Sequence, residues 1–171
     1  MTFWSFFGII YLLNSKSVKV SNTTITINSN NAAGIAFGGN QTNNTLYNVN
    51  IRTNGSNAPA LNVSGNYVNF TMFNSILNAA STNDIYIGNN SIKGEWNLTN
   101  VTFVDILFSV GANGTLNVHW YLDVYVNYTN GTQVSGANVT IRDKDNNSIL
   151  QTFTNPNGFI KTTNILEYAQ T

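Results

Sequence analysis

The heptapeptide Gly8-Ile9-Ile10-Tyr11-Leu12-Leu13-Asn14 is the first copy of a repeat, and this repeat indicates the architecture of the chain. Similar heptapeptides begin at Gly34, Ala60 and Asp84, and a weaker copy begins at Thr115. Their first residues stand 26, 26, 24 and 31 positions apart. Large apolar side chains fill positions two and four of the first four copies. A short strand and a turn that recur at this period are typical of a solenoid whose units stack.

Each heptapeptide is followed by further runs that alternate in the manner of β-strands. Val18–Val20 and Ile25–Ile27 follow the first copy, and Leu46–Tyr47 and Val49–Ile51 follow the second. Gly, Asn and Ser punctuate the gaps between them. Three short strands per repeat predict a triangular coil, and hence an all-β chain that forms a parallel β-helix of about five coils over residues 1–120.

Position seven of the first four copies is always Asn. Asn tolerates the left-handed backbone conformation of tight corners, and stacked amides can hydrogen-bond along a column. The sequence therefore predicts one structural asparagine ladder, made of Asn14, Asn40, Asn66 and Asn90.

The repeat pattern stops near residue 120, and a second domain is predicted over residues 121–171. Strands are expected at Leu122–Val126, Val134–Ile141 and Ile149–Phe153, with a fourth starting at Phe159. This spacing is typical of an antiparallel β-sandwich. About 50 residues is short for one, so we expect a partial sandwich and a chain that is a fragment. The apolar segment Thr2–Leu13 lacks a basic leader and is too short to span a bilayer, so we expect a buried strand there and no membrane insertion.

Composition excludes several classes of partner and site. Only 8% of the 171 residues are charged, against roughly 25% in an average soluble domain, and the net charge is zero. The chain therefore offers no basic patch for nucleic acid. It has no Cys, which excludes disulfide and thiolate–metal frameworks.

The chain is rich in N-glycosylation sequons. Fourteen of its 32 Asn begin Asn-x-Ser/Thr, about twice the chance expectation, which favours an N-glycosylated surface protein. The alternative is that Asn and Thr are simply common in turn-rich solenoids. The candidate acceptors are Asn22, Asn40, Asn43, Asn54, Asn62, Asn69, Asn89, Asn97, Asn100, Asn113, Asn127, Asn130, Asn138 and Asn146.

Two resemblances follow from these patterns. The Gly-Ile-x-aromatic-x-x-Asn repeat, followed by Ser-Lys-Ser-Val-Lys-Val-Ser-Asn-Thr-Thr-Ile at 15–25, resembles the right-handed parallel β-helix repeats of pectate-lyase-like surface proteins. The segments at 132–141 and 154–159 resemble an Ig-like module of the carboxypeptidase-regulatory type. That combination is similar to adhesin-like envelope proteins of archaea and bacteria. It implies an extracellular, cell-surface location and a structural or adhesive role, with surface glycans or other envelope proteins as partners.

The same β-helix class includes polysaccharide lyases and glycoside hydrolases, which need paired carboxylates near a shared groove, or carboxylates that hold calcium. The predicted solenoid offers as acids only Asp84, Glu95 and Asp105. We expect no two of them at matching offsets in adjacent coils. His119 is the only histidine and has no acidic neighbour in the sequence. We therefore predict no catalytic residue and no cofactor.

Two further patterns are candidate sites. Asp143–Ser148 matches the first half of a calcium loop, but Ser148 replaces the required Gly and Thr154 the required Glu, so a hairpin turn is the simpler interpretation and no metal site is predicted. Aromatic side chains outside the repeat could stack on sugars: Tyr47, Tyr67, Trp96, Trp120 and Tyr128. We take Trp96 and Trp120 as the candidate glycan contacts.

The leading hypothesis is a non-enzymatic β-helical stalk or adhesive segment joined to an Ig-like module. The alternatives are a carbohydrate-active β-helix enzyme and a carbohydrate-binding β-helix. Converging carboxylates would favour the enzyme, and exposed aromatic side chains would favour the carbohydrate-binding protein.

Overall fold

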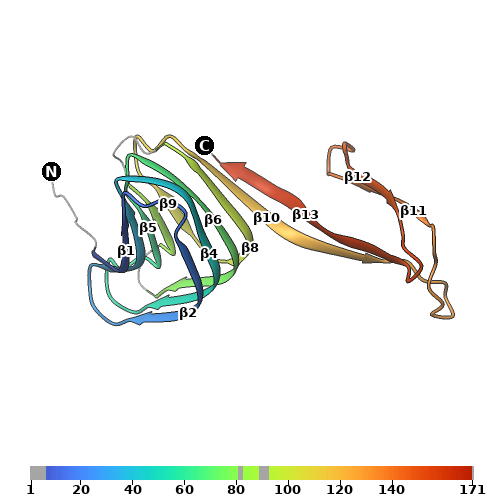
Figure 1. Ribbon diagram of the computed structural model, residues 1–171, viewed down its shortest axis with the longest axis horizontal. Helices are drawn as coiled ribbons and strands as arrows, with labels where there is room; N and C mark the ends of the chain where they lie inside the picture. The colour runs from blue at the N-terminus through green and yellow to red at the C-terminus, as the bar shows by residue number, and fades with distance from the viewer. Residues whose placement is uncertain (1–6, 81–82, 89–92, 171) are drawn as a thin grey trace. The chain divides into compact units, whose positions relative to one another are not determined.

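The computed structural model describes residues 7–80, 83–88 and 93–170. All thirteen regular elements in these residues are β-strands. They include a β-solenoid of about three turns, which agrees with the predicted parallel β-helical architecture (Figure 1).

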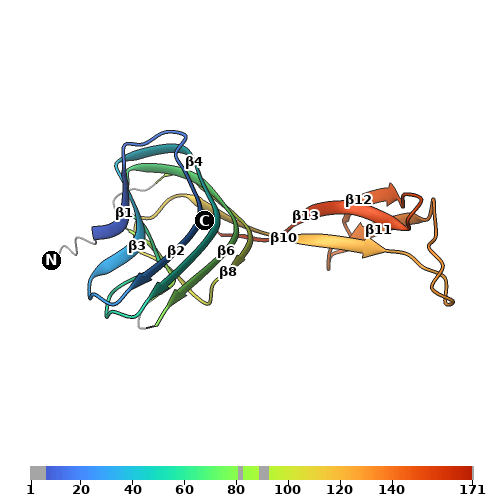
Figure 2. The ribbon, with the colours of Figure 1, turned by 60° about the horizontal axis from the view of Figure 1, so that its bottom comes forward.

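Two sheets form the walls of the solenoid, and the strands of its successive turns pair in parallel. The first has the order β1 (Phe7–Leu13), β3 (Ala32–Gly38), β5 (Leu61–Val63), β7 (Ile85–Ile87) and β9 (Ile106–Phe108). The second has the order β13 (Phe159–Gln170), β10 (Thr115–Tyr125), β8 (Glu95–Thr102), β6 (Tyr67–Ala79), β4 (Asn40–Thr53) and β2 (Lys19–Ile27). Figure 2 shows β2, β4, β6 and β8 side by side. Three turns, β3–β4, β5–β6 and β7–β8, have a neighbour on both sides in both sheets.

The core lies between the two sheets, where apolar side chains from successive strands stand level with one another. One such column of the first sheet is Leu12, Phe37, Val63, Ile87 and Phe108. A column of the second sheet is Val20, Leu46, Met72, Leu98 and Val118. The rings of Phe37 and Phe70 stack across the core with centroids 4.8 Å apart. Burial of these columns is the main favourable term for the solenoid, at about 25 cal/mol per Å² of apolar surface.

The predicted second and third strands of a coil are one continuous strand with a bend. β4 contains both runs expected between Leu46 and Ile51, and Asn48 lies between them with φ 51°. The equivalent residues of β2, β6 and β8 are Asn22, Asn74 and Asn100, with φ 52°, 48° and 53°. Asn adopts this left-handed conformation at lower cost than other residues that carry a Cβ. The two predicted strands are therefore one strand that turns at an asparagine, and we call this position the asparagine corner.

The strand register corrects the predicted alignment of the repeats. The heptapeptides align Ile9 with Ile35, but in the sheet Ile35 is level with Ile10, so the first two copies are offset by one position. Ile85 is level with Ile106, which makes this turn shorter than the turns before it. The weak copy at Thr115 belongs to the second sheet, where Thr115 is level with Glu95. Its likeness to the heptapeptide reflects strand alternation and does not mark a further coil position.

Of the segment Thr2–Leu13, predicted as a buried strand, residues 2–6 lie outside the described residues, and the end of β1 is only half buried. Ile9, Tyr11 and Leu13 of β1 are 63%, 50% and 55% exposed, while Ile10 and Leu12 pack against the core. β1 is the end strand of its sheet, and alternate side chains point to its outer face.

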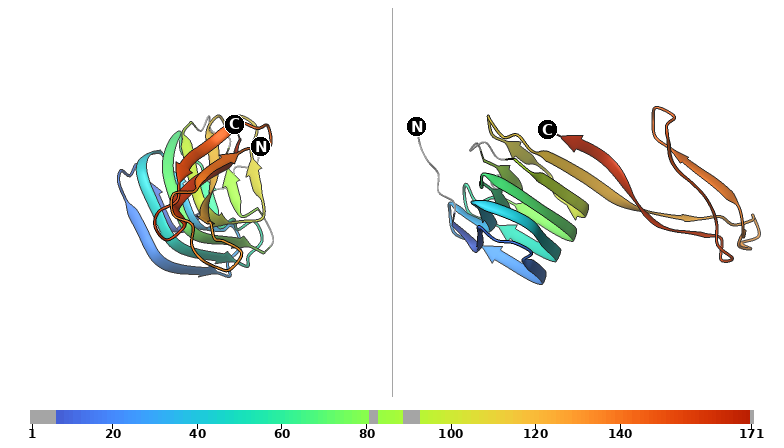
Figure 3. Two further views of the ribbon diagram at one scale, coloured as in Figure 1. Left: turned by 90° about the vertical axis from the view of Figure 1, so that its right-hand side faces the viewer. Right: turned by 45° about the horizontal axis from the view of Figure 1, so that its top comes forward.

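The chain divides into two compact units. One unit comprises the residues up to His119 together with those from Glu167 onward, and the other comprises Trp120–Leu166. In the second unit, β11 (Asn138–Arg142) and β12 (Ser148–Phe153) form an antiparallel pair, seen in Figure 3. Buried Thr154 fixes the loop before β11, because its Oγ1 accepts from the N–H of Ala137 and donates to the carbonyl of Val134.

Candidate functional site

The outer face of the second sheet presents amide and hydroxyl groups at level positions. One column there is Lys19, Thr45, Thr71, Asn97 and Asn117. These positions alternate with the buried column that contains Leu46, so strand periodicity directs them outward. The Asn117 Nδ2 donates to Asn97 Oδ1 at 2.9 Å and to Glu95 Oε1 at 3.1 Å. Neighbouring turns are thus tied together by side chains as well as by backbone.

Beside this column, the asparagine corner forms an amide ladder. Asn48 Nδ2 donates to Asn22 Oδ1, and Asn100 Nδ2 donates to Asn74 Oδ1, both at 2.9 Å. The four residues recur every 26 positions. That strict spacing is the sequence signal that could have identified them.

The predicted ladder members that the structure describes come to one corner of successive turns, but no bond joins their side-chain amides to one another. Asn40 is level with Tyr67, and Asn66 donates its N–H to the carbonyl of Gly39. Asn14 Oδ1 accepts from the backbone N–H of Asn40 at 2.9 Å, so this amide bonds to backbone. The register between β4 and β6 shifts at an irregularity between Gln41 and Asn44, just after this corner. Asn90 lies outside the described residues.

A hollow of about 150 Å³ opens on the same face, and all its polar residues come from β4, β6 and β8. Its lining residues are Asn43, Asn69, Phe70, Thr71, Glu95 and Asn97. Asn69 is fixed in place, because its Oδ1 accepts from the Glu95 N–H at 2.7 Å and its Nδ2 donates to the Tyr67 hydroxyl at 3.1 Å. Sequence reasoning missed this hollow, although Asn43, Asn69 and Glu95 follow each other at equal intervals of one repeat.

Thirteen of the sequon asparagines lie in the described residues, and Asn89 lies outside them. Asn62 is 2% exposed and its Oδ1 has no hydrogen-bond partner in the described structure, so in the folded chain it is a poor acceptor for a glycan. The side chains of the other twelve are exposed or half-buried.

The two tryptophans predicted to contact glycans differ in exposure. Trp96 is fully buried in the core, and its Nε1 donates to the carbonyl of Val68 at 2.7 Å. The prediction that Trp96 contacts a glycan is therefore wrong, because the alternation of β8 directs it inward. The other four aromatic candidates are partly exposed to solvent: Trp120 is 38% exposed, Tyr47 40%, Tyr67 42% and Tyr128 62%.

The expectation that no two acids stand at matching offsets in adjacent coils is wrong. Asp84 and Asp105 do stand at matching positions of adjacent turns, since the residues that follow them are level. Asp84 is 2% exposed, and its carboxylate accepts from the backbone N–H groups of Ala79 and Val104. Asp105 accepts from the Asp84 N–H at 2.8 Å and from Asn83 Nδ2 at 3.1 Å. Every oxygen of this pair already accepts a hydrogen bond, so the pair holds a corner together.

His119 is level with Thr99 and half-buried. Its Nδ1 is buried and has no hydrogen-bond partner in the part of the chain that the structure describes. Thr99, its neighbour in β8, is 3% exposed.

The segment considered as a calcium loop is closed by its own hydrogen bonds. Asp143 Oδ1 accepts from the N–H groups of Asp145 and Asn147, and Oδ2 accepts from Asn147 Nδ2 at 2.8 Å. The Asn147 side chain, followed by the Asn147 backbone, lowers the pKa of Asp143 below its usual 3.8. Asp145 pairs with Lys144 at 2.9 Å. A capped turn accounts for all these oxygens.

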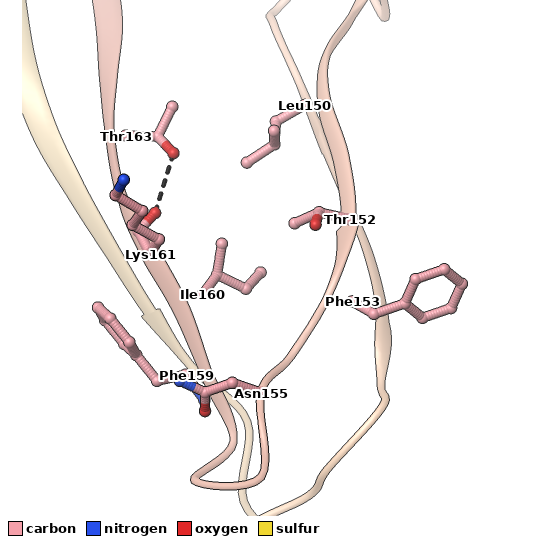
Figure 4. Close-up of a pocket in the computed structure, with 8 residues that line it drawn as sticks. All are labelled: Leu150, Thr152, Phe153, Asn155, Phe159, Ile160, Lys161 and Thr163. Carbon is pink, nitrogen blue, oxygen red and sulfur yellow. Dashed lines mark hydrogen bonds between the residues drawn. The ribbon is translucent and has the colours of Figure 1, made fainter.

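The second unit has an open apolar groove of about 480 Å³ between β12 and β13. In Figure 4, Leu150, Thr152 and Ile160 point into it, whereas Phe153 points away. Lys161 and Thr163 lie along the β13 side, where the Thr163 hydroxyl donates to the Lys161 carbonyl at 3.0 Å. Nothing in the sequence pattern predicts this groove.

The described residues contain no group of three or more His, Asp or Glu side chains arranged to hold a metal ion. They also contain no helix with the length and apolar character of a membrane span. No protein-family model matches the chain, and comparisons with curated proteins and with solved structures found no match.

Proposed function

We propose that this chain is a non-catalytic segment of an extracellular, cell-surface structural or adhesive protein. In this proposal a right-handed β-helical stalk of about five coils, with β1–β2 and β9–β10 as its end coils, precedes an Ig-like module built on residues 121–171. The antiparallel β11–β12 pair supports the Ig-like assignment, and the parallel ladders support the stalk. Other envelope proteins and surface glycans are the partners that it would meet.

The observation that carries the proposal is the placement of the sequons. Twelve of the thirteen described sequon asparagines have exposed or half-buried side chains, on a chain with only 8% charged residues. A protein with so little charge needs another source of solubility, and N-linked glycans on these asparagines would supply it.

The test is a map of sequon occupancy on the full chain, secreted from a host that N-glycosylates. Glycopeptides are released with a peptide N-glycosidase in ¹⁸O-water and sequenced by mass spectrometry. We expect occupancy at several exposed sequons and none at Asn62. Thr24→Ala should remove occupancy at Asn22, whereas the control Thr26→Ala, outside any sequon, should not. An intact mass equal to the unmodified 18.7 kDa chain would contradict the proposal.

A carbohydrate-active enzyme is the second candidate, and the level position of Asp84 and Asp105 is the observation that favours it. Glycosidases need two carboxyl groups that flank the glycosidic bond to be cleaved, either with space for a water molecule or with one carboxylate free to attack the sugar. Here the backbone N–H groups occupy the Asp84 oxygens. We therefore expect no release of reducing sugar from polysaccharides. Release that Asp105→Asn abolishes would favour the enzyme instead.

A further inference from the structure

We propose that the hollow on the outer face of β4, β6 and β8 binds one neutral sugar ring. Its volume of about 150 Å³ equals the room of about five liquid waters, enough for part of a pyranose with the remainder in solvent. The lining combines a carboxylate, a hydroxyl and three amides. These groups match the donors and acceptors that a vicinal diol presents.

The walls of the hollow are held in place before a ligand arrives. Asn69 makes two hydrogen bonds, to Glu95 and to Tyr67, and Asn97 accepts from Asn117. A site whose side chains are already ordered loses little conformational entropy on binding. The remaining groups, Thr71 and Asn43, supply one hydroxyl and one amide at the rim.

An aromatic side chain outside the lining hydrogen-bonds to one of the lining residues. Tyr67 is 42% exposed, and its hydroxyl accepts from Asn69, a lining residue. A half-exposed tyrosine beside polar groups offers an apolar face to the C–H groups of a sugar and a polar tip to its hydroxyls. Polar lining and neighbouring ring together favour a saccharide.

A cation fits the lining less well. Calcium takes six to eight oxygen ligands, commonly several carboxylates. The hollow has one carboxylate, Glu95, and the amide oxygens of Asn69 and Asn97 already accept hydrogen bonds. A neutral polyol, unlike a cation, can bind through the donors and acceptors of the lining that are not already used within the protein.

The sugar could come from two sources. Asn43, Asn69 and Asn97 all begin sequons, but Asn69 and Asn97 are half-buried and hydrogen-bonded, whereas Asn43 is exposed, so the first ring of the Asn43 glycan could occupy the hollow. A saccharide of another molecule could enter the same hollow when Asn43 is unmodified. Both sources present the same pyranose chemistry.

The first experiment uses the full chain made without N-glycans. Saturation-transfer NMR is recorded with methyl glycosides of glucose, mannose, galactose and N-acetylglucosamine at about 10 mM, a concentration suited to millimolar affinity. We expect transfer from at least one glycoside. Thr71→Val and Glu95→Gln should each weaken its binding about tenfold, because each removes a hydrogen bond made in the site. The matched controls Thr102→Val and Asp145→Asn, outside the hollow, should bind as the parent does, and circular dichroism checks that every variant folds.

Absence of transfer from all four glycosides would overturn the inference, as would transfer that neither Thr71→Val nor Glu95→Gln weakens. Backbone shifts around Glu95 on addition of calcium chloride alone, without transfer from any glycoside, would assign the hollow to a cation and also overturn it.

The second experiment distinguishes the sources by using the chain made with N-glycans. If added glycoside no longer binds, and Thr45→Val, which removes the Asn43 sequon, restores binding, then the chain's own glycan fills the hollow. If binding persists with Asn43 occupied, the ring belongs to another molecule. Either result supports a sugar site. A chain without N-glycans would contradict the proposed function but leave the first experiment intact, so the two failures are distinguishable.

Discussion

The Asp84 Oδ2 accepts a hydrogen bond from the backbone N–H of Val104, on the next turn of the solenoid, at 2.6 Å. The other carboxylate oxygen accepts from the N–H of Ala79. One buried side chain thus satisfies backbone donors from two turns. Buried backbone donors left without a partner are costly, which gives this acid a structural reason to be inside.

Asp84→Ala should lower the free energy of unfolding by about 2–4 kcal/mol, because it leaves two backbone donors without an acceptor. Asp84→Asn should cost less, since one acceptor oxygen remains. Urea denaturation followed by circular dichroism measures both. The control is Asp105→Ala, an exposed position, with an expected loss of about 1 kcal/mol. Equal losses for Asp84→Ala and Asp105→Ala would contradict the bridging role.

The asparagine corner predicts an unusual order of substitutions at Asn48. Asn48→Ala should destabilise by about 1–2 kcal/mol, because alanine is strained at φ 51° and the bond to Asn22 is lost. Asn48→Gly should cost less, since glycine adopts positive φ without strain. Denaturation curves of both variants are compared with Asn50→Ala, two residues along the same strand at negative φ. A glycine variant less stable than the alanine variant would argue against backbone strain.

Trp96 should behave as a core residue. Trp96→Ala should destabilise by about 3–5 kcal/mol, because it empties a buried site and removes the bond to Val68. Trp120→Ala, at a site that is 38% exposed, should cost less than half as much. Acrylamide quenching gives a second readout: Trp96→Phe should remove the most protected component of the fluorescence. Easy quenching of Trp96 in the parent chain would show that it is not buried.

The Asp143 turn predicts a dependence on acid. Its hydrogen bonds with Asn147 hold the pKa of Asp143 below 3.8. The folded pKa is lower than the unfolded one, so the stabilisation is fully present above pH 3.8 and is lost as the pH falls through the folded value. Carboxyl ¹³C NMR should show Asp143 titrating below 3.8, and Asn147→Ala should raise its pKa toward 3.8. Identical titration curves in the two proteins would show that Asn147 is not the cause.

Much of the solenoid could be predicted from particular residues. Ile35, Leu61 and Ile85 repeat at intervals close to one turn. They form a second buried column of the first sheet, beside the column that contains Phe37. Such columns are detectable because burial requires apolar side chains at every turn. The asparagine corner is equally regular, but four of 32 asparagines are hard to single out without knowing which backbone positions have positive φ.

The candidate site could be predicted less well than the fold. Trp is common in sugar sites, which favours a surface position for Trp96, yet the alternation of β8 directs it inward, in the column that contains Phe70 and Leu116. Alignment of the repeats by similarity places Asp84 and Asp105 at different offsets. The turn between them is shorter than the others, and this brings the two acids level.

The all-β character of this chain and its periodic coiling can be read from the residues alone, because every turn must supply apolar side chains to the core. Which asparagines stack, which acids meet and where the polar hollow opens are properties of the folded chain. Those relationships depend on hydrogen-bond register between residues a full turn of the solenoid apart. A change of one residue in loop length shifts that register and leaves the local pattern unchanged.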